Sequence, residues 1–158
     1  MSAPDKDASQ RADAERRALL LDADLFFSVK VTAMLKHIGM ATVTARKTAD
    51  WNQRLRTERF DITLVNTAAQ GIDWREAIVE ARRAGLPVIA YGSHVDIETQ
   101  AEARDAGATR VIANSKLAAD LPSIIEQTLR RMQGAADRAA TESGSDARPD
   151  LDTQDDDA

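Results

Sequence analysis

The chain of 158 residues contains no cysteine and few aromatic residues: two tryptophans, one tyrosine and three phenylalanines. Without cysteine it cannot form disulfides, iron–sulfur clusters or thiolate zinc sites, and an intracellular setting is favoured. The two histidines, His37 and His94, lack the spacing of metal ligands. No apolar run has membrane-spanning length, and the first residues lack the apolar core of a signal peptide. We therefore expect a cytoplasmic protein with no membrane partner.

The net charge of −5 is distributed unevenly along the chain. From Gly134 onward eight acidic residues stand against two arginines, so the rest of the chain is nearly neutral and gives no reason to expect nucleic-acid binding. Residues 133–158 contain hardly any large apolar side chain and are predicted to be a disordered acidic tail, which either solubilises the protein or acts as an interaction arm. Residues 1–16 are polar and predicted to be flexible, which leaves residues 17–132 as one domain.

Between these ends, short apolar runs alternate with segments of helical periodicity. The runs are residues 18–21, 41–45, 62–65, 87–91 and 109–113. The segments between and after them repeat apolar residues at helical spacing, and Gly39, Gly85 and Gly107 mark helix ends. Five β–α units with short connections predict a parallel sheet with helices on both faces, because crossovers between parallel strands are right-handed.

Two helix starts carry capping signals. Thr48 is placed to cap a helix that buries Trp51, and Asp73 with Glu76 three residues later forms an Asp-led variant of the capping box. The last helix is predicted to begin near Leu121, with Pro122 in its first turn, where a missing N–H is tolerated.

The carboxyl ends of parallel strands meet at one edge of a sheet, which is where ligands bind in open α/β folds. Polar or small residues follow four of the predicted strands. These residues are Asp22, Ala23 and Asp24 after the first strand, Asn66 on the third, Gly92 and Ser93 after the fourth, and Asn114 after the fifth. An asparagine such as Asn66 forms hydrogen bonds, but it is a poor nucleophile and carries no charge to hold a metal.

Three stretches, together with the alternation, resemble the bacterial response-regulator receiver domain over about residues 17–132: Asp22-Ala23-Asp24, Gly71-Ile72-Asp73 and Ala106-Gly107-Ala108. The resemblance implies a flavodoxin-like α/β fold, with a five-stranded parallel sheet in the order 2-1-3-4-5 and five helices. In that family an aspartate on the third strand accepts a phosphoryl group and an acidic pair after the first strand holds magnesium. A hydroxyl residue ends the fourth strand and a lysine ends the fifth.

This chain departs from the family pattern at nearly every chemical group. Asn66 stands at the phospho-acceptor position, Ala23 at the second acid, Gly92 at the hydroxyl position and Asn114 at the lysine position. Phosphoryl transfer needs the lost groups, because they supply the nucleophile and stabilise the transferred charge. We therefore predict a degenerate receiver domain that is not an enzyme and uses no cofactor. Asp22 and Asp24 are interpreted as turn and cap residues, with cation binding as a weaker alternative.

The resemblance further implies a function in signal transduction through docking, with a protein partner or a second copy of the chain. In such domains the face from the fourth helix to the fifth contacts partners. The candidate apolar residues on this face are Ile97, Val111, Leu117 and Leu121. The neighbouring aromatics Phe26 and Phe27 are expected to divide between surface and core, and Phe26 is a second candidate for a contact patch.

Two other functions remain open at this point. Residues 20–24, Leu-Leu-Asp-Ala-Asp, also resemble the start of haloacid-dehalogenase-type phosphohydrolases, in which the first aspartate attacks phosphate and the second acts as acid and base. Against this, no acidic pair follows a late strand. The third possibility is a small-ligand-binding module that uses the same crevice; the lack of a glycine-rich phosphate loop speaks against dinucleotides.

Overall fold

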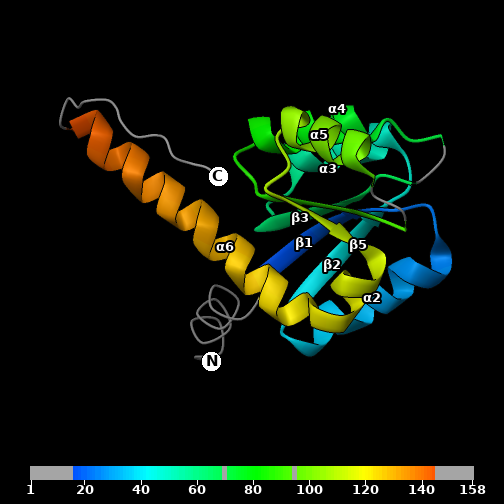
Figure 1. Cartoon of the computed structure of the whole chain (residues 1–158). Helices are drawn as coiled ribbons and strands as arrows, with labels where there is room; N and C mark the ends of the chain where they lie inside the picture. The colour runs from blue at the N-terminus through cyan, green and yellow to red at the C-terminus, as the bar shows by residue number, and fades with distance from the viewer. Residues whose placement is uncertain (1–15, 69–70, 94–95, 145–158) are drawn as a thin grey trace.

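The computed structural model describes residues 16–68, 71–93 and 96–144. Five parallel strands form one sheet in the order β2-β1-β3-β4-β5 (Figure 1), which confirms the order implied by the resemblance. The strands are β1 (Arg16–Leu21), β2 (Met40–Ala45), β3 (Ile62–Asn66), β4 (Val88–Gly92) and β5 (Arg110–Ala113). The central strands β3 and β4 are buried along their whole length, as continuous apolar runs in a covered parallel sheet require.

Helices cover both faces of this sheet. They are α2 (Leu25–His37), α3 (Thr48–Thr57), α4 (Trp74–Arg83), α5 (Ile97–Ala106) and α6 (Asn114–Gly144). α2 and α6 pack on one face, and α3, α4 and α5 lie on the other (Figure 1). Within the described residues, no helix combines the length and the apolar character that crossing a membrane requires.

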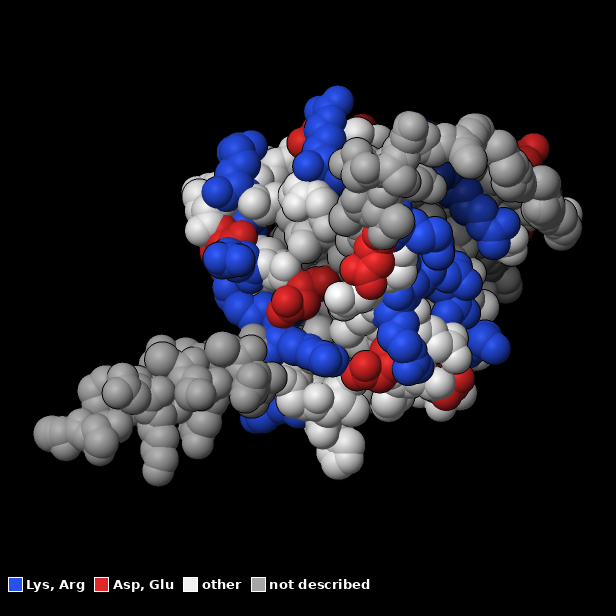
Figure 2. Space-filling view, turned by 90° about the vertical axis from the view of Figure 1, so that its left-hand side faces the viewer, with Lys and Arg blue, Asp and Glu red and all other residues white. Residues whose placement is uncertain are grey.

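The strands begin and the helices end at the same edge of the sheet, which we call the amino edge. Figure 2 looks onto this edge and shows Lys and Arg side chains spread over it, with fewer Asp and Glu between them. We call the opposite edge, where the strands end, the carboxyl edge. The amino edge is occupied by charges, whereas the residues expected to form a site lie at the carboxyl edge.

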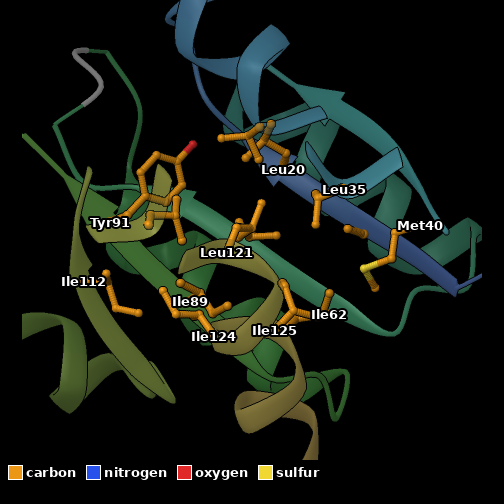
Figure 3. Packing of buried hydrophobic residues seen from close by; sticks show 14 residues of the cluster. Leu20, Leu35, Met40, Ile62, Ile89, Tyr91, Ile112, Leu121, Ile124 and Ile125 are labelled. Atoms are coloured by element: carbon orange, nitrogen blue, oxygen red, sulfur yellow. The ribbon is translucent and has the colours of Figure 1, made fainter. Parts of the chain in front are cut away.

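The larger core lies between the sheet and the helices α2 and α6 (Figure 3). Leu20, Ile62 and Ile89 project from alternate positions of β1, β3 and β4 onto this face. Leu35 meets them from α2 and Leu121 from α6, and all five side chains are fully buried. Tyr91 belongs to the same cluster, two residues beyond Ile89, at the end of the strand nearest the carboxyl edge.

The capping predictions had different outcomes. Asp73 caps α4 as expected, because its Oδ1 accepts a hydrogen bond from the Glu76 backbone N–H at 3.1 Å. The prediction that Thr48 caps α3 is wrong. Lys47 is the N-cap of this helix, and its side chain makes no capping hydrogen bond. Thr48 is already helical, and its hydroxyl accepts a bond from the Asp73 N–H at 3.2 Å. It therefore joins the start of α3 to the start of α4.

The last helix differs from the sequence-based boundaries. α6 already begins at Asn114, and a non-helical residue, Asp120, divides it just before Leu121 and Pro122, so that Pro122 lies in the first turn of the second part. The helix then continues to Gly144, which contradicts the expectation of a disordered tail from residue 133. Alanines recur over residues 135–140 and favour helix strongly enough to extend it. Residues 145–158 of the predicted tail and residues 1–15 of the predicted N-terminal segment lie outside the described residues.

Alanine substitutions at two glycines are expected to change stability with opposite signs, because one glycine ends a helix and the other lies inside one. Gly107 ends α5 with φ +119°, and a Cβ there would lie 2.6 Å from the Cγ of Arg82. Gly134 lies within α6, and a Cβ would meet only the end of the Arg138 side chain at 3.8 Å. We expect Gly107→Ala to lower the free energy of unfolding by about 1–2 kcal/mol in urea titrations, because the left-handed conformation strains an L side chain.

Gly134→Ala is the matched control, with the opposite sign. It should raise the free energy of unfolding by up to about 1 kcal/mol, because alanine favours a helix over glycine by that amount. A loss of stability or of helical circular-dichroism signal would contradict a helix that continues through residue 134.

Candidate functional site

The register of the sheet brings the predicted site residues to the carboxyl edge. Leu21 pairs with Val65, which places the following residue, Asp22, beside Asn66. Asn66 pairs with Tyr91 on β4. The side chains of neighbouring parallel strands in register point to the same face, so these three residues continue the stripe of the larger core. The apolar core therefore ends in a polar group at this edge.

Asp22 is the centre of this group and is only 1% exposed. Its Oδ1 accepts hydrogen bonds from the Asn66 side-chain amide at 3.0 Å and from the Asp24 backbone N–H at 2.8 Å. Its Oδ2 accepts a bond from the Tyr91 hydroxyl at 2.5 Å. Donors from β3, β4 and the turn after β1 thus occupy both oxygens, which is how a buried carboxylate is kept stable without a cation.

Asn66 is also satisfied at both ends of its amide. While Nδ2 donates to Asp22, Oδ1 accepts a bond from the Ala68 backbone N–H at 2.8 Å. The second bond fixes which end of the amide faces Asp22, because the oxygen is needed for the turn after β3. The side chain is 6% exposed and neutral. It can stabilise its neighbours through hydrogen bonds, but it offers no nucleophile to a substrate.

Tyr91 is the site residue that sequence reasoning missed. Its ring packs against Phe27 of α2, with ring centroids 5.5 Å apart, and its hydroxyl reaches Asp22. Burial raises the pKa of the Tyr91 phenol well above its usual value, and the nearby charge of Asp22 adds to this shift. One signal was present in the sequence: a buried tyrosine hydroxyl needs a partner, and Tyr91 lies on the same strand face as Ile89, at the edge where the acids gather.

The turn after β1 positions the second acidic residue for a structural role. Asp24 caps α2, because its Oδ1 accepts bonds from the N–H groups of Phe26 and Phe27 at 3.0 and 3.1 Å. This confirms the expected N-cap. Ala23, between the two aspartates, is exposed and brings no polar side chain to the group.

The other predicted crevice residues lie at the same edge without joining this network. Gly92 ends β4 opposite Ala113 and is buried, whereas Ser93 is exposed. Asn114 begins α6, and its Oδ1 is buried without a hydrogen-bond partner. The expected convergence of Asp22, Asn66, Gly92 and Asn114 therefore holds as a shared edge, and a direct contact links only Asp22 with Asn66 among the described contacts.

The predicted docking face is corrected by the burial of its residues. Leu117 and Leu121 are both 0% exposed and belong to the larger core, because the apolar side of α6 faces the sheet. Val111 is half-buried and packs against the core on the other face. Only Ile97 is exposed, at 84%, so these four residues do not form an apolar patch.

The structure instead displays apolar side chains at the start of α2. Leu25, Phe26 and Val29, which we call the α2 patch, are 50%, 90% and 65% exposed. A groove of about 330 Å³ runs beside the patch, between α2 and the end of β2, and Thr44 and Arg46 line its far side. The exposure of Phe26 agrees with its expected surface position, since its neighbour Phe27 packs against the core.

Comparison with known proteins finds likeness in structure only. No family model matches the sequence, and no curated protein matches it significantly. The CheY-like receiver domain protein from Methanospirillum hungatei JF-1 is 19% identical with a TM-score of 0.69, over 76% of this chain and 98% of that one. The signal receiver domain of an HD domain-containing protein from Pseudomonas fluorescens Pf-5 is 16% identical with a TM-score of 0.70, over 79% and 94%.

A third structure, the receiver domain of a sensor histidine kinase from Pseudomonas aeruginosa PAO1, holds a magnesium ion in its active-site cleft. It is 19% identical, with a TM-score of 0.66 over 73% of this chain and 98% of that one. Identities this low establish a shared fold, and the chain is receiver-like in that sense.

The residues at this edge do not fit a magnesium ion. Magnesium needs hard oxygen ligands, usually carboxylates, in a nearly octahedral arrangement. Both oxygens of Asp22 are occupied by donors, and Asn66 turns its N–H toward the place where a ligand oxygen would be required. Within the described residues, no group of three or more His, Cys, Asp or Glu side chains could hold a metal.

Tyr91 can be tested directly because it is the only tyrosine, so tyrosinate absorbance reports this phenol alone. Its native pKa is raised, so the native state keeps a proton that the unfolded chain loses. The resulting stabilisation is complete below about pH 10 and is lost as the pH rises through the native pKa. We expect the native protein to show no tyrosinate absorbance at a pH where the urea-unfolded protein is half ionised.

Tyr91→Phe provides the control for this titration. It should lower the free energy of unfolding at pH 7 by about 2 kcal/mol, because a buried charge loses a donor. It should also lose stability less steeply above about pH 10. Ionisation of the native phenol near its ordinary pKa would contradict the proposed network.

Proposed function

We propose that this protein is a receiver-like signalling module that works without phosphorylation and acts by docking to a protein partner. The observation that carries the proposal is the buried group in which Asn66 and Tyr91 both donate to Asp22. Asn66, at the position where receiver domains have the phospho-acceptor aspartate, uses its side-chain amide to donate a hydrogen bond to Asp22. The buried carboxylate of Asp22 is consequently engaged by the protein's own donors.

Conversion of this site to phosphoryl chemistry would need several changes at once. A cation would have to compete with the Asn66 amide and the Tyr91 hydroxyl for the oxygens of Asp22. Each hydrogen bond to a charged group contributes about 1.5–3 kcal/mol, so displacing them is costly. The amide also gives no carboxylate oxygen to attack phosphorus, and neither Gly92 nor Asn114 supplies the hydroxyl or the positive charge that would stabilise a phosphoryl group.

The same contacts count against the phosphohydrolase alternative. That reaction requires Asp22 as an accessible nucleophile and Asp24 as an acid and base. Asp22 is 1% exposed, and Asp24 holds the N-terminus of α2 through two backbone N–H groups. A substrate could use these two aspartates only by breaking the hydrogen bonds that Asp22 and Asp24 make within the protein.

The α2 patch is the surface that we propose for docking. Phe26 and Val29 are large apolar side chains that are mostly exposed to water, and they lie close together on one helix beside a groove. Neighbouring exposed apolar side chains of this kind often mark an interaction surface. α2 contains Lys30 and Lys36 but no acidic residue, and Arg46 lines the groove. The chemistry of the surface therefore fits a partner segment with apolar side chains flanked by carboxylates.

Phosphorylation can be tested with acetyl phosphate and magnesium, followed by intact mass spectrometry. We expect no adduct of one phosphoryl group, because residue 66 is an amide. The Asn66→Asp variant is the informative companion: if the amide alone blocks the reaction, this variant gains an adduct, and if the missing cation site also matters, it does not. A stoichiometric adduct on the wild-type protein that Asp22→Ala removes would contradict the proposal.

Docking can be tested with two glutamate substitutions at equally exposed apolar residues. Phe26→Glu should abolish partner capture from a lysate of the organism of origin, whereas Ile97→Glu should retain it. Both residues are nearly free of packing, so both variants should unfold at the wild-type temperature. Sedimentation of the pure protein shows whether the partner is a second copy. Equal losses in the two variants, or none in Phe26→Glu, would refute docking through the α2 patch.

A further inference from the structure

Lys and Arg side chains gather at the amino edge (Figure 2). The arginines among them belong to both strands and helices. β1 begins with Arg16 and Arg17, and β5 begins with Arg110. Arg131 of α6 belongs to the same edge, because its guanidinium donates to the Thr109 carbonyl just before β5. The last turns of three helices add Arg56, Arg82, Arg83 and Arg104.

Most of these eight arginines have no carboxylate partner among the described residues. Three pairs are formed, namely Arg16 with Glu126, Arg17 with Glu58 and Arg83 with Glu80. The others either donate to neutral groups or make no ion pair. Arg82, for example, donates to the sulfur of Met132, and Arg110 donates to Gln127. The amino edge thus carries more positive than negative side chains (Figure 2), with acidic and uncharged residues between them.

Helix dipoles explain only part of this excess. Cations in the last turn of a helix are favoured by the partial negative charge at its C-terminus, which accounts for Arg56, Arg82, Arg83 and Arg104. Arg16 and Arg17 are balanced by their glutamate partners. Arg110 opens a strand and Arg131 lies inside α6, so neither gains from a helix C-terminus, and in the described contacts both donate to neutral groups. The charge of these two arginines is the part that an anionic ligand would balance.

α6 directs an anionic segment of this same chain toward the amino edge. Arg82 contacts Met132, so α6 passes the amino edge at that residue, and it then projects beyond the sheet to Gly144 (Figure 1). The sequence that follows, residues 145–158, contains six aspartates and one arginine. The acidic segment thus begins on the side of the molecule where the arginines are unpaired.

We propose that residues 145–158 bind back onto the arginine-rich amino edge of their own chain and screen it. The distances allow this contact. The helix carries its end about 18 Å past Met132, since each helical residue rises about 1.5 Å. Fourteen residues in extended form span up to about 46 Å, so the segment can return to the edge. A short tether keeps the effective concentration near the millimolar range, which makes weak, multiple ion pairs sufficient.

Paramagnetic relaxation tests this contact without interference, because the chain has no cysteine of its own. A nitroxide is attached through Ala158→Cys, and amide signals are recorded with and without reduction of the label. At low salt we expect the amides of Arg17, Arg59 and Arg110 to lose most of their intensity, while Asp24 and Ser93 at the carboxyl edge keep theirs. At 1 M salt, where the screening length is about 3 Å, the loss should disappear.

Matched variants separate charge from other causes. Neutralising the tail, with Asp150, Asp152, Asp155, Asp156 and Asp157 changed to Asn, should abolish the effect, and Leu151→Ser should preserve it. Arg56→Gln with Arg104→Gln should weaken the effect, whereas the same charge loss at the other edge, Arg46→Gln with Lys47→Gln, should not. Broadening that survives tail neutralisation, is equal at both edges, or arises only between labelled and unlabelled molecules in a mixture would overturn the proposal.

Discussion

A single buried carboxylate determines the arrangement of the carboxyl edge. An ionised carboxylate without partners would cost several kcal/mol in the interior, so Asp22 must be surrounded by donors. Those donors come from Asn66 on β3, Tyr91 on β4 and the backbone of Asp24. An aspartate at position 66 would place two like charges 3 Å apart at the distance observed for the amide contact. A neutral donor at position 66 therefore suits this network better than a second carboxylate would.

The network also depends on the exact register of three strands. Side chains alternate along a strand, so a shift of one residue in β4 would turn Tyr91 toward the α3–α4–α5 face and leave Asp22 short of a donor. The apolar stripe of Leu20, Ile62 and Ile89 favours the same register, because it buries those side chains under α2 and α6. The hydrogen bonds to Asp22 and the burial of the apolar stripe thus require the same register of the strands, and together they disfavour other registers.

The fold and half of the site could be predicted from the sequence. Alternating apolar runs predicted five strands in a parallel sheet, and the resemblance to receiver domains supplied the strand order. The rule that parallel strands end at one edge brought Asp22 to Asn66. Tyr91 was missed because, within a run of Val, Ile and Ala, an aromatic residue looks like core filling. Leu117 and Leu121 were misjudged because the docking face implied by the resemblance was assigned to them. Their own spacing points to the core, since they continue the helical stripe of Ile124, Ile125 and Thr128, which are all buried. The end of α6 was misjudged because acidic composition outweighed the alanines before Gly144.

The hydrogen-bonded group around Asp22 and the proposed docking surface are physically connected. The Asp24 N–H bonds Asp22, and the Asp24 carboxylate caps α2 through Phe26 and Phe27. Phe27 then packs on Tyr91, which returns to Asp22. Every step of this loop fixes the first turn of α2, where the cap directs Phe27 inward and leaves its neighbour Phe26 outside. The residues that surround Asp22 therefore also hold the α2 patch in one orientation.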